Sequence, residues 1–264
     1  MKLKYVVAGV NENATYIHCV PFFIKAWKSL HQDVEIRIIL FANEMPTFLA
    51  EFKDSIILVT PIVGVSTAFC SQIVRLFYPC ILPNDGAVMI SDIDLLPLNF
   101  NYFKDALKGK QVDHFVTFRA NHMKKHNRQE VVMCYNAAYS AVWSDIFQVE
   151  SYQDMIEKMI SIYSQIEYED KHNGKGWRTD QRYLFQALGR WSKKNEQHIE
   201  CTDEELQFQR LNGNVIDLDG ACQWIRKKKA VDIHVNKNLL FSSDNKTREL
   251  YEQRVWKYIK AAET

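Results

Sequence analysis

The stretch Ala-Val-Met-Ile-Ser-Asp-Ile-Asp at residues 87–94 decides the fold class of this chain. The turn residues Asn-Asp-Gly at 84–86 precede it, and an unbroken apolar run of this length is typical of a short strand buried on both faces. The stretch closes with Asp92 and Asp94. Because residues two apart on a strand point to the same side, the pattern predicts two carboxylates that face one pocket at a sheet edge.

Strand patterns of this kind alternate with helical patterns along the rest of the chain. Further strands are predicted at residues 4–9, 35–42, 55–60, 115–118 and 131–135, and helices at 16–30, 66–81, 151–168 and 246–262. Such alternation is typical of an α/β fold with a mainly parallel central sheet and helices on both faces. Because no repeat or Gly/Ser-rich linker divides the chain, we expect a single domain over 1–264, with the segment 191–264 packing back on the core.

The composition argues against several classes of protein. The 264 residues carry 33 Lys and Arg against 32 Asp and Glu, so a net charge of +1 gives no field that would recruit nucleic acid or an anionic membrane. No apolar run approaches the roughly 20 residues that span a bilayer, so we expect no transmembrane segment. The apolar stretch at 5–10 is too short for a secretory signal, and we expect a cytoplasmic protein. The six cysteines form no C-x-x-C pair, which indicates neither a zinc site nor a redox dithiol.

The two aspartates also predict a metal site. Two carboxylates held on one side repel each other unless a cation lies between them or one of them is protonated. Oxygen ligands suit a hard divalent ion such as Mg²⁺ or Mn²⁺, and ligands gather at the carboxyl ends of the strands of parallel sheets. The alternative interpretation is an aspartate that caps a turn at the end of a strand, and the pattern leaves both open.

The segment from 66 to 98 resembles the signature of the GT-A glycosyltransferases. In that signature a helix bearing an Arg leads through a Leu-Pro turn into a strand that ends in Asp-x-Asp. Arg75, Leu82-Pro83 and Asp92-x-Asp94 occupy these positions here. The pattern is similar to the glycogenin-like branch in particular, and the chain from about residue 4 to 188 also resembles the glycosyltransferases of large algal DNA viruses.

The resemblance implies a single GT-A fold, Rossmann-like and typical of nucleotide-diphospho-sugar transferases. It implies a hexosyl- or related sugar transferase that moves a sugar from a nucleoside-diphosphate sugar, most of all a UDP-sugar, to a glycan or glycoprotein acceptor. A viral capsid glycan would be one such acceptor, and the host cytoplasm would then be the location. The implied cofactor is Mn²⁺ or Mg²⁺, held by Asp92, Asp94 and His234. Residues 1–100 would bind the nucleotide sugar, and 101–190 the sugar and the acceptor.

The resemblance also assigns residues that bind the donor. It implies a loop after the first strand, at Ala8, Gly9, Val10 and Asn11, that seats the base and ribose; a plain strand-to-helix turn is the alternative. Arg75 would meet the charge of the leaving diphosphate, and Asp92 and Ile93 would contact the donor. Lys237 would touch the phosphates, but it follows the metal-binding histidine more closely than is usual in the family. The Gly and Pro-Trp that accompany such a lysine are missing here.

Three further residues are expected to line the cleft for the sugar. Asn136 lies in a segment similar to the family's Asn-Ala-Gly, with Ala138 where Gly is usual; the alternative is an apolar strand with one Asn in it. The family places an Asp-Gln pair where Asp180 and Gln181 stand. Asp180 would then accept the acceptor's proton or orient the sugar hydroxyls, and Gln181 would lie beside the anomeric carbon. A helix N-cap is the alternative for Asp180.

Two other functions stay open. A sugar-phosphate nucleotidyltransferase shares an α/β core and a metal-binding carboxylate pair, but it usually carries a Gly-rich basic loop after the first strand, which residues 9–12 lack. A catalytically silent carbohydrate-binding protein would keep the fold without turnover. The sequence has no P-loop, no G-x-G-x-x-G and no G-x-S-x-G, so nucleotide-hydrolysing P-loop, dinucleotide-binding and α/β-hydrolase functions have no local support.

Overall fold

The computed structural model describes residues 1–124, 129–193, 196–212, 217–240 and 242–264. A seven-stranded sheet lies at its centre, with strand order β3-β2-β1-β4-β7-β6-β8. The strands of this sheet are β1 (Leu3–Asn11), β2 (Glu35–Phe41), β3 (Ile56–Val59), β4 (Ala87–Ile90), β6 (Phe115–Thr117), β7 (Asn136–Tyr139) and β8 (His198–Glu200). A second sheet has three strands in the order β5-β10-β9, namely β5 (Leu95–Pro97), β9 (Arg210–Asn212) and β10 (Asp232–His234).

The large sheet is mainly parallel. β1 pairs in parallel with β2 and β4, β2 pairs in parallel with β3, and β6 pairs in parallel with β8. β7 runs against both of its neighbours, β4 and β6. The α/β fold class with a mainly parallel central sheet is therefore confirmed, and β4 lies where the quoted stretch predicted a buried strand.

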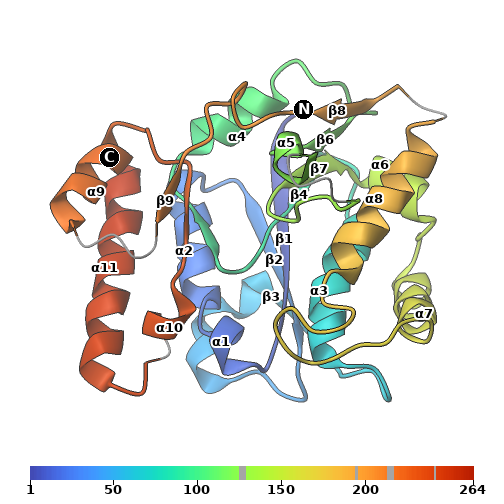
Figure 1. Ribbon diagram of the computed structural model, residues 1–264, viewed down its shortest axis with the longest axis horizontal. Helices are drawn as coiled ribbons and strands as arrows, with labels where there is room; N and C mark the ends of the chain where they lie inside the picture. The colour runs from blue at the N-terminus through green and yellow to red at the C-terminus, as the bar shows by residue number, and fades with distance from the viewer. Residues whose placement is uncertain (125–128, 194–195, 213–216, 241) are drawn as a thin grey trace.

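Helices cover both faces of the large sheet (Figure 1). Four pack into one core: α2 (Val20–Leu30), α4 (Phe100–Leu107), α9 (Leu218–Arg226) and α11 (Asn245–Glu263). Four pack into the other: α3 (Thr67–Phe77), α6 (Ser140–Phe147), α7 (Tyr152–Tyr163) and α8 (Thr179–Trp191). The short helices are α1 (Ala14–Ile17), α5 (Ala120–Lys124), α10 (Lys237–Leu240) and the 3₁₀ helices Thr47–Ser55 and Tyr78–Ile81. Within the described ranges, no helix combines the length and the apolar character that crossing a membrane requires.

The side chains of β1 alternate between these two cores, as the period of a strand requires. Val6 and Ala8 belong to the core that contains α2, whereas Tyr5 and Val7 belong to the core that contains α3. Both faces of β1 are thus buried, which explains the apolar stretch at 5–10 within it.

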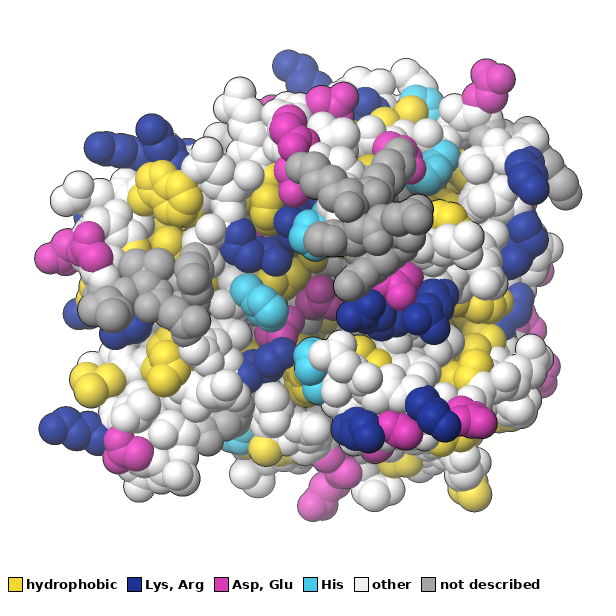
Figure 2. Space-filling view, in the orientation of Figure 1, with side chains coloured by type: hydrophobic (Ala, Val, Ile, Leu, Met, Phe, Trp, Pro, Cys, Tyr) yellow, Lys and Arg dark blue, Asp and Glu magenta, His cyan; other side chains and the backbone are white. Residues whose placement is uncertain are grey.

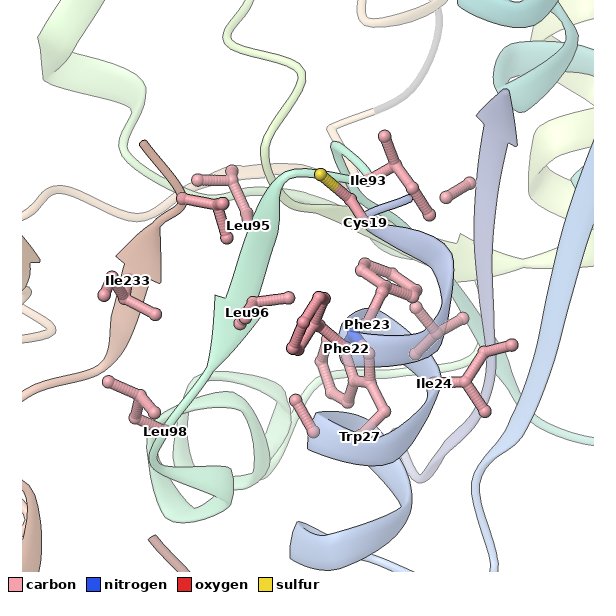
Figure 3. Close-up of a cluster of buried hydrophobic side chains, with 14 of the residues drawn as sticks. Cys19, Phe22, Phe23, Ile24, Trp27, Ile93, Leu95, Leu96, Leu98 and Ile233 are labelled. Carbon is pink, nitrogen blue, oxygen red and sulfur yellow. The ribbon is translucent and has the colours of Figure 1, made fainter. Parts of the chain in front are cut away.

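Aromatic side chains of α2 pack against the small sheet (Figure 3). Phe22, Phe23 and Trp27 join Leu96 of β5 and Ile233 of β10 in one cluster, and each is at most 5% exposed. Burying such side chains is the main favourable contribution to folding. This cluster fixes β5 and β10, the two strands of the small sheet that adjoin the polar residues described below.

Helix α3 approaches β1 closely at Gly9. A Cβ added to Gly9 would lie 2.0 Å from the carbonyl oxygen of Ser71, so only a residue without a side chain fits there. The helix begins as its sequence predicts, with the Ser66 hydroxyl accepting a hydrogen bond from the backbone N–H of Ala68. The close contact fixes the distance of α3 from the sheet.

Two predictions about strand positions are wrong. The strand expected at 131–135 starts only at Asn136, because the antiparallel register of β7 on β4 pairs Asn136 with Ile90. The residues from 8 to 11 are not a loop but the last four residues of β1, and their register against β2 runs on to the pairing of Asn11 with Phe41. The first strand is therefore longer than its apolar run.

Candidate active site

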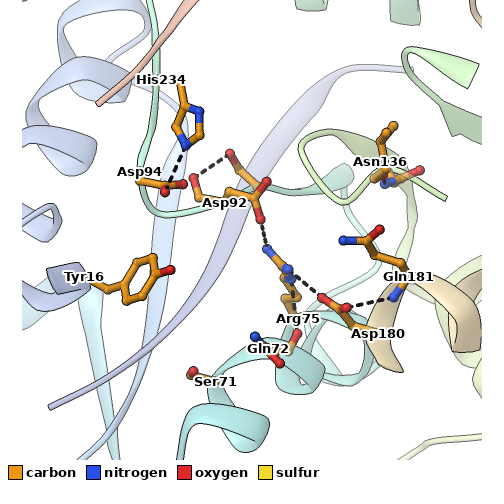
Figure 4. Close-up of polar contacts among 12 residues, drawn as sticks. Tyr16, Ser71, Gln72, Arg75, Asp92, Asp94, Asn136, Asp180, Gln181 and His234 are labelled. Carbon is orange, nitrogen blue, oxygen red and sulfur yellow. Dashed lines mark hydrogen bonds and ion pairs between the residues drawn. The ribbon is translucent and has the colours of Figure 1, made fainter. Parts of the chain in front are cut away.

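Acidic residues follow β4 at the carboxyl edge of the large sheet. β4 ends at Ile90, and Asp92 and Asp94 lie in the turn that leads to β5, where the N–H of Leu95 donates to the carbonyl of Asp92 over 3.2 Å. The prediction that the two carboxylates share one side of a strand is wrong, because β4 has already ended at Ile90. Figure 4 shows Asp94 turned toward His234 and Asp92 toward Arg75.

The surface above this turn is hollowed. Figure 2 shows acidic side chains at the bottom of a hollow near the middle of one face, with Lys, Arg and His side chains around it. A recess with acidic groups inside and basic groups at its rim suits a ligand that carries phosphate together with a cation.

Asp94 accepts two hydrogen bonds on a single oxygen. Its Oδ2 lies 3.1 Å from His234 Nε2 and 2.5 Å from Lys237 Nζ. The pairing of β10 with β5 sets His234 opposite Leu95, and the N–H of Val235 donates to the carbonyl of Asp94 over 2.9 Å. Burial acts to raise the pKa of Asp94, but the His234 hydrogen bond and the Lys237 charge outweigh it and hold that pKa well below its usual range.

Tyr16 of α1 completes the surroundings of Lys237. The Lys237 ammonium donates to the Tyr16 hydroxyl over 3.4 Å and lies 4.5 Å from the centre of its ring, within the range of a cation–π contact. Burial acts to lower the pKa of Lys237, but the negative charge of Asp94 raises it above the usual value. No local pattern pointed to this contact of Tyr16, because 221 residues separate it from Lys237.

Arg75 joins two carboxylates. Its Nη1 donates to Asp92 Oδ1, its Nη2 to Asp180 Oδ2 over 2.6 Å, and its Nε to the carbonyl of Gln72 over 3.1 Å (Figure 4). Each guanidinium nitrogen thus has an acceptor inside the protein, and the side chain is buried. In this structure the charge of Arg75 is balanced by Asp92 and Asp180, and its contact with the diphosphate stays a prediction.

Asp180 is held on both of its oxygens. Oδ2 binds Arg75, and Oδ1 accepts the backbone N–H of Gln181 over 2.8 Å. Asp180 is 2% exposed, and burial raises its pKa although the Arg75 charge opposes the rise. Asp180 is not the N-cap of α8, because Arg178 occupies that position without a side-chain cap bond. A carboxylate that binds both α3 and the start of α8 can hold the two helices in place relative to each other.

Asn136 and Gln181 each present a buried oxygen. Asn136 Oδ1 and Gln181 Oε1 have no hydrogen-bond partner among the residues that the structure describes. The segment before β7 ties the two residues together, since Asn136 Nδ2 donates to the carbonyl of Val132 over 2.8 Å and the N–H of Val131 donates to the carbonyl of Gln181 over 3.2 Å. A buried acceptor without a donor costs free energy, which a bound hydroxyl would recover.

Glu130 is a buried carboxylate that the sequence did not point to. Its Oε1 accepts from Arg182 Nε over 3.2 Å, and its Oε2 lies 3.5 Å from Arg178 Nη1. Both arginines flank the Asp180-Gln181 pair along the chain. No local pattern surrounds Glu130, so only the fold reveals the contact.

The apolar residues expected to contact the donor lie in the core. The side chains of Ala8, Val10 and Ile93 are buried in the cluster around α2, so only their backbone atoms could contact a donor. Asn11 is 8% exposed, and its Nδ2 donates to Thr67 Oγ1 over 3.1 Å. Gly9 packs against α3, and its lack of a side chain is what allows this close packing.

The donor set at this edge suits a divalent ion in its chemistry. Two carboxylates and an imidazole are ligands that Mn²⁺ accepts, and Asp94 and His234 are already in contact. Asp92 instead binds Arg75. Within the described part of the chain, no three His, Cys, Asp or Glu side chains lie close enough together to hold an ion. The chemistry of the three residues suits the ion, but they are not assembled around one point here: Asp92 binds Arg75, and Lys237 binds Asp94.

No protein-family model and no curated protein sequence matches the chain. Solved structures do resemble it. The galactosyltransferase LgtC, crystallised with donor and acceptor sugar analogues, has a TM-score of 0.50 at 11% identity, over 96% of this chain and 95% of its own. The glycosyltransferase GlyE of Streptococcus pneumoniae TIGR4 has a TM-score of 0.52 at 16% identity, over 98% of this chain and 63% of its own, so this chain spans less than two thirds of GlyE. At these identities the likeness concerns the fold: the chain has the GT-A fold that these glycosyltransferases share.

Proposed function

We propose that this chain is a metal-dependent glycosyltransferase that moves a sugar from a nucleoside-diphosphate sugar, in the first instance a UDP-sugar, to a glycan or a protein-linked glycan. One observation carries the proposal: Asp94, a buried carboxylate beyond the carboxyl end of β4, shares an oxygen between His234 and Lys237. An acid, an imidazole and an ammonium in contact can receive a divalent ion together with phosphate oxygens. The fold supports the proposal, since LgtC and GlyE are both named as glycosyltransferases.

The charged residues would act on the diphosphate. When bound by Asp92, Asp94 and His234, Mn²⁺ or Mg²⁺ would offset the negative charge that builds up as the glycosidic bond breaks. Lys237 carries a compact charge on a flexible side chain, so it would bind the phosphate oxygens directly. Charges that meet the leaving group in the transition state lower the barrier more than contacts that bind the substrate alone.

The amide residues would hold the sugar. Asn136 Oδ1 and Gln181 Oε1 are buried acceptors, and sugar hydroxyls are donors that would satisfy them. The ion pair of Asp180 with Arg75 fixes the start of α8 and thereby the place of Gln181. The resemblance implied that Asp180 accepts the acceptor's proton or orients the sugar hydroxyls; we propose it instead as a positioning residue.

A screen of UDP- and GDP-sugars with the purified chain tests the proposal. Transferases slowly pass their sugar to water, so we expect at least one UDP-sugar to release UDP with Mn²⁺ and not with EDTA. Release of pyrophosphate from a nucleoside triphosphate and a sugar phosphate would identify a nucleotidyltransferase instead. A metal-dependent thermal shift with UDP but no release from any donor, with or without added oligosaccharides, would identify a silent binding protein.

A further inference from the structure

Lys237 lies where the proposed divalent ion would have to bind. Its Nζ is 2.5 Å from Asp94 Oδ2, the same oxygen that His234 contacts at 3.1 Å. The Asp94 side chain is only 9% exposed, so water screens this ion pair poorly. The Tyr16 ring and hydroxyl hold the ammonium from another side. Asp94 is thus already neutralised by a residue of the chain itself.

A divalent ion on Asp94 would meet this ammonium at short range. Like charges repel strongly when both are partly buried, so the ion and the Lys237 ammonium disfavour each other. His234 must also release Asp94 before its Nε2 can face a metal, because a nitrogen that donates a hydrogen bond has no lone pair to offer. The ion therefore has to displace contacts that the protein has already made.

Lys237 is able to leave Asp94 if it gains another anion. It is the first residue of the short helix α10, and its side chain is 22% exposed, which leaves the ammonium a route toward solvent. A diphosphate bound through the ion would offer that anion within reach of a long, flexible side chain.

We infer that Lys237 competes with the divalent ion for Asp94, and that the donor's diphosphate ends the competition by drawing Lys237 to itself. The inference rests on the proposed function and deepens it. Ion and nucleotide then bind tightly only together, and the coupling is reciprocal: whatever UDP adds to the affinity for the ion, the ion adds to the affinity for UDP. A transferase built in this way holds the ion weakly until its donor arrives.

Titration with Mn²⁺, followed by the electron paramagnetic resonance of the free ion, tests the inference on the full chain with and without UDP. Lys237→Met removes the ammonium and keeps a side chain of similar length, and Lys237→Gln is a second neutral variant if the first does not fold. Lys260→Met, on the exposed surface of α11, removes an equal charge elsewhere. Circular dichroism checks the fold of each protein.

Without UDP, we expect Lys237→Met to bind Mn²⁺ about ten- to a hundredfold more tightly than the unmodified chain, within the usual range of coupling between sites. Lys260→Met should match the unmodified chain. UDP should tighten Mn²⁺ binding less in Lys237→Met than in the unmodified chain. Equal or weaker Mn²⁺ binding by Lys237→Met would overturn the inference and leave the proposed function intact. If no protein bound Mn²⁺ even with UDP, the metal dependence of the proposed function would fall as well.

Discussion

The guanidinium of Arg75 and the carboxylate of Asp180 form an ion pair of 2.6 Å between α3 and α8, across 105 residues of sequence. Both side chains are buried, and Asp92 binds the same guanidinium. One cation therefore connects the turn after β4 with the helix that carries Gln181. This connection sets the proposed phosphate and sugar parts of the site relative to each other.

Arg75→Met should destabilise the fold strongly. The substitution leaves Asp180 buried without its charged partner, and such a loss costs about 3–5 kcal/mol in free energy of unfolding. Urea denaturation measures the change. Lys175→Met is the control, because its pair with Glu167 is exposed on both sides and should leave the urea midpoint nearly unchanged. Equal midpoints for the two variants would contradict the role given to Arg75.

Gly9→Ala should also destabilise the fold. The new Cβ would lie 2.0 Å from the Ser71 carbonyl oxygen and 2.9 Å from Val74 Cγ1, so α3 must shift away from β1, at a cost of about 1–3 kcal/mol. Gly189→Ala in α8 meets nothing within 4 Å and should stabilise the helix by about 0.5–1 kcal/mol. In thermal unfolding, Gly9→Ala should lower the midpoint and Gly189→Ala should raise it. A Gly9→Ala variant with an unchanged or raised midpoint would refute the packing argument.

Gln181→Ala should lower activity and spare the fold. Its Oε1 has no donor among the described residues, so the folded protein loses no hydrogen bond there, whereas a bound sugar would lose one worth about 1–3 kcal/mol, or roughly ten- to a hundredfold in rate. Steady-state kinetics and the thermal midpoint are measured together. Gln186→Ala, exposed on the same helix, is the matched control. A lowered midpoint with an unchanged rate would show that Gln181 is structural.

Two tyrosines near β10 should respond in opposite ways to loss of their hydroxyls. The Tyr135 hydroxyl donates to buried Asp232 over 2.8 Å, so Tyr135→Phe should cost about 1.5–3 kcal/mol in free energy of unfolding. The Tyr102 hydroxyl is buried without a partner in the described ranges, so Tyr102→Phe should be neutral or stabilising. Urea denaturation measures the free energy of unfolding of both variants. A similar loss in both would mean that the hydrogen bond from Tyr135 to Asp232 does not stabilise the fold.

Much of the fold followed from local patterns. The long parallel strands are apolar runs, and α3 starts at a serine cap, so periodicity and capping sufficed there. The three-residue strands β5, β9 and β10 are too short to show a period, and their place depends on pairing with one another and on the packing of β5 against α2. The start of β7 was misplaced because the apolar residues before it are equally buried in the core.

The contacts of the site were harder to predict than its residues. The sequence predicted Asp92, Asp94 and His234 as metal ligands, a role that stays a prediction, but their contacts depend on distant elements. His234 reaches Asp94 across 140 residues, and Arg75 reaches Asp180 across 105. The chain gave no local reason to pair Arg75 with two acids. Such choices depend on burial, which the sequence does not show at single positions.

The most direct measurement compares Mn²⁺-dependent UDP release from the preferred UDP-sugar by the unmodified chain and by Asp94→Ala. The account predicts that the variant keeps its circular dichroism spectrum and that its rate falls about a thousandfold or more, equivalent to about 4 kcal/mol in the barrier. EDTA should abolish the rate of the unmodified chain and leave the residual rate of the variant unchanged. A near-normal rate of Asp94→Ala with excess Mn²⁺ would contradict the account.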